Sequence, residues 1–157
     1  MSRFSSFDLS RSVARVSAST AMLALAAGLA GCGAVGSWDK ATSDAWAVTY
    51  EVTVAGGSDD SLNDVSYLEA EKRGEDSTEV TEDSVATTDD AKKKASSIWS
   101  VESMVTAQKD ASIAATPAQG GTATCRILLD GVKEIASETG APGKRVQCEA
   151  TTPAFKK

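Results

Sequence analysis

The sequence contains no histidine. Without an imidazole, neither a Ser-His-Asp triad nor a Cys-His pair can form, and hydrolysis by those arrangements is excluded. A zinc site is disfavoured as well, because Cys125 and Cys148 lie too far apart to make a four-ligand set. Carboxylate pairs for acid–base catalysis are available, but no spacing distinguishes one of them. We therefore expect a protein that is not an enzyme and holds no metal or cofactor.

Positive charge is scarce. Sixteen Lys and Arg face 22 Asp and Glu, which gives a formal net charge of −6. An acidic chain without a basic patch is poorly suited to bind nucleic acid, so no nucleic-acid partner is expected. Anionic membranes would repel it too, so membrane contact should come from lipid and not from charge.

A long hydrophobic run is also missing. The apolar stretch over residues 21–30 is about ten residues long, too short to span a bilayer as a helix. It follows a segment that carries Arg3, Arg11 and Arg15, and small residues close it. This arrangement is typical of a secretory signal peptide.

The end of that segment carries a cysteine. Residues 29–32 read Leu-Ala-Gly-Cys, which resembles the lipobox of bacterial lipoproteins. The resemblance implies that residues 1–31 are a cleaved signal peptide and that Cys32 carries the lipid, a palmitate-type anchor, on its sulfur. The protein would then sit on the extracytoplasmic face of the cell membrane. The alternatives are a secreted protein cut elsewhere and a poor membrane span.

The cysteine count fits an exported chain. There are three cysteines, and an odd one needs its own explanation, which the lipobox gives to Cys32. Cys125 and Cys148 then remain outside the cytoplasm, where a disulfide between them can persist. Two buried free thiols are the alternative.

The chain has strand patterning and almost no helical periodicity. Alternation with period two is clearest where Trp46, Val48, Tyr50, Val52 and Val54 share one face. The further strands that the pattern predicts cover residues 65–68, 98–105, 111–115, 122–129, 132–137 and 145–150.

Two residues between strands mark a hairpin. Asp130-Gly131 favours a type I′ turn, which needs positive φ at both central positions. A strict two-residue loop would place Ile127 opposite Glu134, so a bulge is expected to shift that register. Cys125, Ile127 and Leu129 share the inward face.

The predicted domain organisation has four parts. Residues 1–31 form the signal peptide, 32–45 a flexible tether, 46–150 the folded domain and 151–157 a tail. Within the domain, residues 70–95 carry eight acidic and five basic residues. Such a segment buries little, and we expect it to be a solvated, mobile excursion.

Six or seven short strands without repeats predict an all-β fold. A small antiparallel β-sandwich buries one face of each strand. The order Trp-Cys-Cys differs from the Cys-Trp-Cys order of true immunoglobulin domains, so we expect an immunoglobulin-like architecture without membership of that family.

Four segments together resemble the MmpS family. The residues V-T-Y-E-V at 48–52 look like the family's first strand, and C-R-I-L-L-D-G-V at 125–132 resembles its C-R-I-x-x-D-G-V. Val65-Ser66-Tyr67 and Ile98-Trp99-Ser100 resemble two further strands, and Cys148 falls where the second cysteine of the family falls. The likeness covers residues 46–150. Better-known members carry a transmembrane helix in place of the lipobox.

The resemblance implies a β-sandwich on the outer side of an actinobacterial membrane. It further implies an accessory subunit of MmpL-type transporters of the resistance-nodulation-division (RND) class, which export lipids or siderophores. A membrane-anchored module that binds a lipid or small molecule without a transporter is the second hypothesis. Fold analogy alone carries neither, so both are expectations.

Overall fold

The computed structural model describes residues 44–57, 61–91 and 95–155, which contain nine strands and no helix. The strands are β1 (Ala45–Ala55), β2 (Ser61–Glu69), β3 (Thr78–Ala86), β4 (Thr88–Asp89), β5 (Ser96–Thr106), β6 (Asp110–Pro117), β7 (Thr122–Leu129), β8 (Lys133–Thr139) and β9 (Val146–Thr151). Accordingly, the described part of the chain offers no helix that could cross a membrane. The predicted signal peptide, Cys32 and nearly all of the predicted tether lie outside the described residues.

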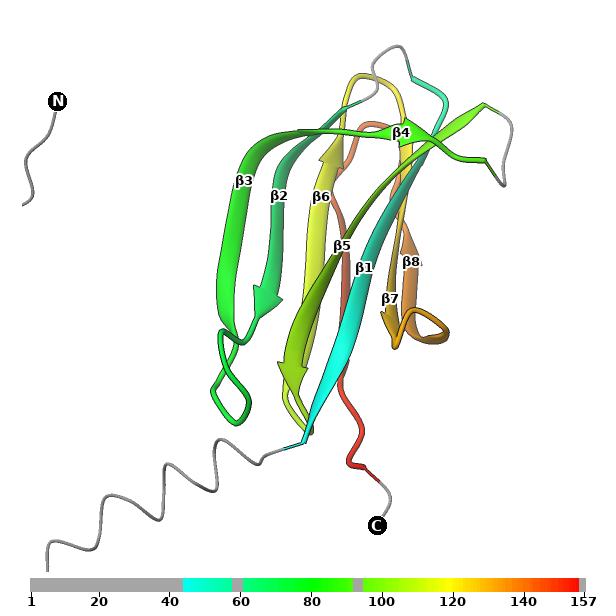
Figure 1. The fold of residues 1–157 in the computed structure, drawn as a ribbon. Helices are drawn as coiled ribbons and strands as arrows, with labels where there is room; N and C mark the ends of the chain where they lie inside the picture. Colours follow the sequence, from blue (N-terminus) through cyan, green and yellow to red (C-terminus); the bar gives the residue numbers. More distant parts are fainter. Residues whose placement is uncertain (1–43, 58–60, 92–94, 156–157) are drawn as a thin grey trace, which may run out of the picture. The chain divides into compact units, whose positions relative to one another are not determined.

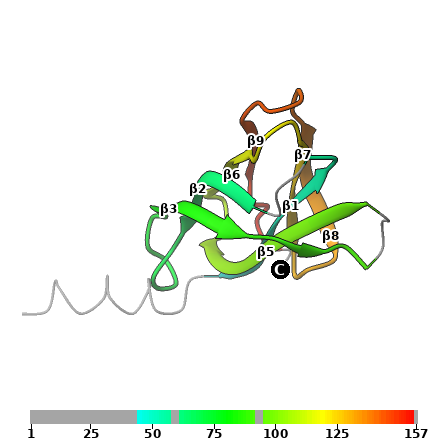
Figure 2. The same cartoon turned by 90° about the horizontal axis from the view of Figure 1, so that it is seen from above.

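Two antiparallel sheets pack face to face. One has the order β4-β5-β1-β7-β8 and the other the order β3-β2-β6-β9. Figure 1 shows the long strands running along the domain while the short β4 crosses its upper end, and Figure 2 shows the domain from above. The predicted small antiparallel β-sandwich is confirmed. The described residues form nine strands, where six or seven were predicted.

Strand β1 is the centre of the larger sheet. All eleven of its residues pair with β5, and Val48–Ala55 pair with β7 on the other edge. Val48, Tyr50, Val52 and Val54 point into the core and are buried. The predicted inward face of this strand is therefore confirmed.

Aromatic rings connect the core to one side of the sandwich. The Tyr50 and Tyr67 ring centroids lie 5.7 Å apart, and those of Tyr67 and Trp99 lie 6.1 Å apart. The Tyr50 hydroxyl donates to the Leu68 carbonyl oxygen at 2.7 Å, which joins the two sheets. Burial raises the pKa of both tyrosines, so they stay neutral and act as packing groups.

The β7–β8 hairpin has the predicted turn. Asp130 and Gly131 have φ values of 52° and 68°, and the Val132 amide donates to the Leu129 carbonyl oxygen at 3.0 Å. This is the positive φ pair that a type I′ turn requires. The register shifts between Ile127 and Leu128, so Ile127 lies opposite Ala136 and the expected bulge is confirmed.

The prediction of a solvated, mobile excursion over residues 70–95 is wrong where the segment forms strands β3 and β4, although most of its side chains are exposed. Strand β3 lies in this segment and pairs with β2. The pairing begins with Thr78 opposite Glu69 and ends with Ala86 opposite Ser61. The chain then crosses to the other sheet as β4, and the Thr87 hydroxyl donates to the Ser97 hydroxyl at 2.8 Å in the interior. Charged side chains on β3 do not prevent a strand, because β3 is an edge strand and charges there oppose aggregation.

The boundary of the folded domain also differs. Strand β9 extends to Thr151, Thr152 is 1% exposed, and the chain stays packed as far as Phe155. The predicted tail over 151–157 is therefore part of the domain up to Phe155. Its strong contacts are to β1 and the β5–β6 turn, which a local sequence pattern does not reveal.

The layer architecture is that of a sandwich, but the strand order is not that of an immunoglobulin domain. In an immunoglobulin domain the first strand lies at a sheet edge. Here β1 is central, between β5 and β7. The distinction matters because a central strand is held on both sides.

We predict that β3 contributes to stability through two side chains. Val80 and Val85 lie opposite Tyr67 and Leu62 and pack against the core. Replacing either valine by alanine should lower the free energy of unfolding by about 1 kcal/mol. The matched controls, Thr81→Ala and Ser84→Ala on the exposed face of β3, should change it by less than about 0.5 kcal/mol. Denaturant unfolding measures both sets, and equal effects would contradict the packing of β3.

Candidate functional site at the base of the sandwich

The candidate site is the end of the sandwich at which β1 begins, called the base below. It consists of residues 44–47, the β2–β3 connection (70–77), the β5–β6 turn (107–109) and the C-terminal segment (152–155). Figure 1 shows these segments together at the lower end of the domain. The base therefore combines four parts of the chain that are far apart in sequence.

Thr152 holds the C-terminal segment in the base. Its hydroxyl lies 3.1 Å from the carbonyl oxygen of Thr106 and 3.0 Å from that of Lys109. The Thr152 amide donates to the carbonyl oxygen of Lys109 at 2.9 Å, and the Thr152 carbonyl oxygen accepts from the Gln108 amide at 3.0 Å. The Ala107 amide donates to the carbonyl oxygen of Asp44 at 2.9 Å, so the β5–β6 turn also holds the start of β1. Buried polar groups satisfied in this way make a rigid junction.

The β2–β3 connection is fixed to the same turn. The Thr106 hydroxyl accepts from the Gly74 amide at 3.0 Å and donates to the Glu75 carbonyl oxygen at 2.9 Å. Lys109 forms an ion pair with Asp76 at 2.6 Å, and this bond raises the pKa of Lys109. Both side chains are exposed, so the pair itself contributes little stability. The hydroxyl of Thr106 is the stronger constraint on this connection.

Trp46 and Phe155 close the base. Their rings stack with centroids 4.1 Å apart and an interplanar angle of 16°. The Trp46 indole Nε1–H donates to the Pro153 carbonyl oxygen at 2.7 Å. The sequence pattern places Trp46 on the inward face of its strand. It predicts no role for Phe155, which lies in the predicted tail over residues 151–157. The missed indication was an aromatic residue in an otherwise polar end.

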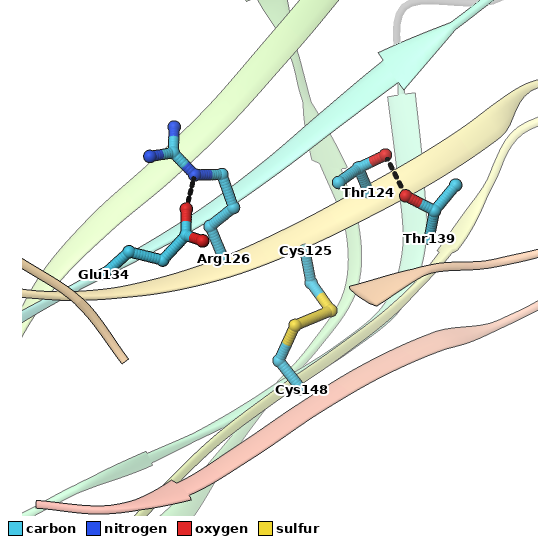
Figure 3. The surroundings of a disulfide bond; sticks show 6 residues. All are labelled: Thr124, Cys125, Arg126, Glu134, Thr139 and Cys148. Atoms are coloured by element: carbon cyan, nitrogen blue, oxygen red, sulfur yellow. Dashed lines mark hydrogen bonds and ion pairs between the residues drawn. A yellow bond between two sulfur atoms is a disulfide. The ribbon is translucent and has the colours of Figure 1, made fainter. Parts of the chain in front are cut away.

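The cysteine pair lies in the core between the sheets. Cys125 on β7 and Cys148 on β9 are fully buried and form a disulfide, with Cα atoms 6.0 Å apart. Figure 3 shows Cys125 pointing towards Cys148, while Thr124 and Arg126 point to the opposite face of β7. The predicted pairing is present, and the two free thiols of the alternative are not.

The outer face of the larger sheet carries a charged cluster. Arg126 on β7 contacts Glu134 on β8 at 2.6 Å and Glu51 on β1 at 3.2 Å. These side chains are partly exposed, and such pairs tie strands together without adding much stability. One cation faces two carboxylates, so the cluster keeps a net negative charge.

The outer face of the smaller sheet has an open groove of about 330 Å³. Arg145 lies across it and donates to the Ser66 hydroxyl at 3.0 Å and to the Asp64 carbonyl oxygen. The groove is lined by Ser66, Tyr67, Leu68, Glu79, Ser112, Ala114, Arg145, Gln147 and Glu149. Polar side chains predominate, which suits a small polar molecule better than a lipid chain.

The described residues include no group of three or more His, Cys, Asp or Glu side chains that could hold a metal ion. Comparison of the chain with protein-family models, with curated proteins and with solved structures finds no match.

We predict that the disulfide is a principal stabilising link between the sheets. It closes a loop with a sequence separation of 23 residues. The variant with both Cys125→Ala and Cys148→Ala should lose about 3 kcal/mol of unfolding free energy, on the chain-entropy relation. The intact mass of the unreduced protein should also fall two hydrogens short of the reduced mass. Two thiols that titrate after unfolding without reductant would contradict this prediction.

Proposed function

We propose that this protein is a lipid-anchored lipoprotein of the cell envelope that serves as a non-catalytic accessory subunit of an MmpL/RND-type transporter, which exports lipids or siderophores. The anchor is Cys32, and the folded part lies on the extracytoplasmic face of the membrane. The proposal takes the transporter from the resemblance to the MmpS family.

One observation carries most of the weight. The segments that resemble MmpS proteins lie at the structural centre of the sandwich and not on scattered loops. V-T-Y-E-V forms the middle of β1, and the C-R-I-L-L-D-G-V segment forms the second part of β7 and the following turn, with Cys125 bonded to Cys148. A likeness concentrated in the core supports a common fold, from which the transport role follows as analogy.

The segment between the anchor and β1 limits how far the sandwich can move from the membrane. Residues 33–44 lie between Cys32 and β1, and even fully extended they reach roughly 40 Å. A lipid on Cys32 would confine the sandwich to a shell of that depth at the membrane. Confinement raises the effective concentration at a membrane partner, so a weak interface suffices for assistance by contact.

The groove beneath Arg145 favours a second hypothesis. Its polar lining suits an envelope-anchored module that binds a small polar molecule without any transporter. Purification of the intact lipoprotein in mild detergent separates the two hypotheses. Co-purification of a large transporter supports the first, and a bound small molecule without a transporter supports the second.

We predict that Cys32→Ala abolishes both labelling and assistance. Metabolic labelling with a palmitate analogue should mark the wild-type protein and not the variant, since Cys32 carries the lipid. Two or more acyl chains anchor a protein stably, so the variant should leave the membrane fraction. Export of the transporter's cargo should then fall at ordinary expression levels, although the sandwich still folds.

The matched control keeps Cys32 and replaces Ser37 in the intervening segment by alanine; it should label and export as the wild type does. A Cys32→Ala variant that is still labelled and remains on the membrane would contradict lipidation at Cys32. A secreted, anchor-free sandwich that restores full export would sink the mechanism of assistance while leaving the anchor intact.

A further inference from the structure

Large hydrophobic side chains are exposed at one end of the domain. Among the described residues, Val132 is 84% exposed and Phe155 is 38% exposed, and no other large hydrophobic side chain is classed as exposed. Phe155 lies in the base. Val132 lies on the β7–β8 turn, where the neighbouring Asp130 amide donates to the Ala47 carbonyl oxygen at 2.8 Å. Both therefore lie at the end where β1 begins.

The stacked pair of the base has the properties of an interfacial group. The indole N–H of Trp46 is already bonded to the Pro153 carbonyl oxygen, so what its ring and Phe155 present to the outside is apolar. Aromatic side chains of this kind favour the boundary between lipid and water. The chain as a whole is acidic, but the two residues after Phe155 in the sequence are Lys156 and Lys157, and these two cations are attracted by anionic headgroups.

We propose that the base rests on the lipid bilayer itself, with Phe155, Trp46 and Val132 in contact with the headgroup region. The inference rests on the proposed anchor at Cys32 and deepens it. The segment of chain outside the described residues leads from the base to Cys32. The membrane in which the lipid of Cys32 is inserted would then face the base.

The contact also sets an orientation. Leu129, the last residue of β7, pairs with Val48, which is three residues beyond the start of β1. At about 3.3 Å per residue, Leu129 therefore lies roughly 10 Å from the first residue of β1 along the strand direction, and the β7–β8 turn that follows it begins beside Ala47, nearer to the base. Phe155 and Val132 touch one plane only if the sandwich leans towards β8. The opposite end, with the β6–β7 and β8–β9 connections, then points away from the bilayer.

Tryptophan quenching by brominated lipids tests this orientation. The chain has three tryptophans, Trp38, Trp46 and Trp99. The protein isolated from membranes is reconstituted into phosphatidylcholine–phosphatidylglycerol vesicles with brominated acyl chains. A form with Trp46 alone carries Trp38→Phe and Trp99→Phe, and the matched form with Trp99 alone carries Trp38→Phe and Trp46→Phe. We expect Trp46 to be quenched several-fold more strongly than Trp99, which lies on β5 opposite Val52 and away from the base.

Two substitutions address the contact directly. Phe155→Asp should reduce the quenching of Trp46 to the level of Trp99, because a carboxylate is expelled from the interface. Val132 is 84% exposed on a turn, so Val132→Asp should leave folding unchanged and should reduce the quenching as well. Equal, weak quenching of Trp46 and Trp99 in a membrane-bound chain would overturn the inference, and so would stronger quenching of Trp99.

Failure of the anchor can be told apart from failure of the contact. If the isolated chain carries no lipid, the proposed function fails. The Cys32 thiol can then be coupled to a maleimide lipid, since Cys125 and Cys148 are already paired. In this form the quenching of Trp46 still tests whether the base contacts the bilayer, with the same two outcomes.

Discussion

The rest of the structure depends on the position of β1 at the centre of the larger sheet. Its backbone is bonded to β5 along its whole length and to β7 along most of it. Its inward side chains fill the core, and Tyr50 reaches the opposite sheet through its bond to Leu68. Because β1 begins at the base and pairs on both sides, it connects the base to the centre of the larger sheet.

Sequence periodicity predicted the parts of the fold in which local pattern and burial agree. The alternation through Tyr50, the turn at Asp130 and Gly131 and the inward parity of both cysteines each follow from short-range rules. Strand β3 was missed because only its two valines face inward, and its charges resembled those of a solvated loop. The hydrogen bonds that hold β3 come from its pairing with β2, which the composition of the segment does not predict.

The base was beyond sequence analysis for a different reason. Thr152 is one polar residue among several near the end of the chain, and its partners Thr106 and Lys109 are more than forty positions away. No period or motif links them. The same holds for Phe155, whose partner Trp46 lies near the start of the folded domain in the sequence although the two rings stack in the structure. Contacts of this length depend on the complete fold.

The central claim is that the base is one rigid unit. Native-state hydrogen exchange at the amides of Gln108 and Thr152, which donate across the junction, tests it most directly. The account predicts opening free energies within about 2 kcal/mol of those of β1 amides, and clearly above that of the Lys144 amide in the β8–β9 turn. Exchange of Gln108 and Thr152 at the rate of unstructured chain would contradict it, because the stacked Trp46–Phe155 pair would then have no fixed support.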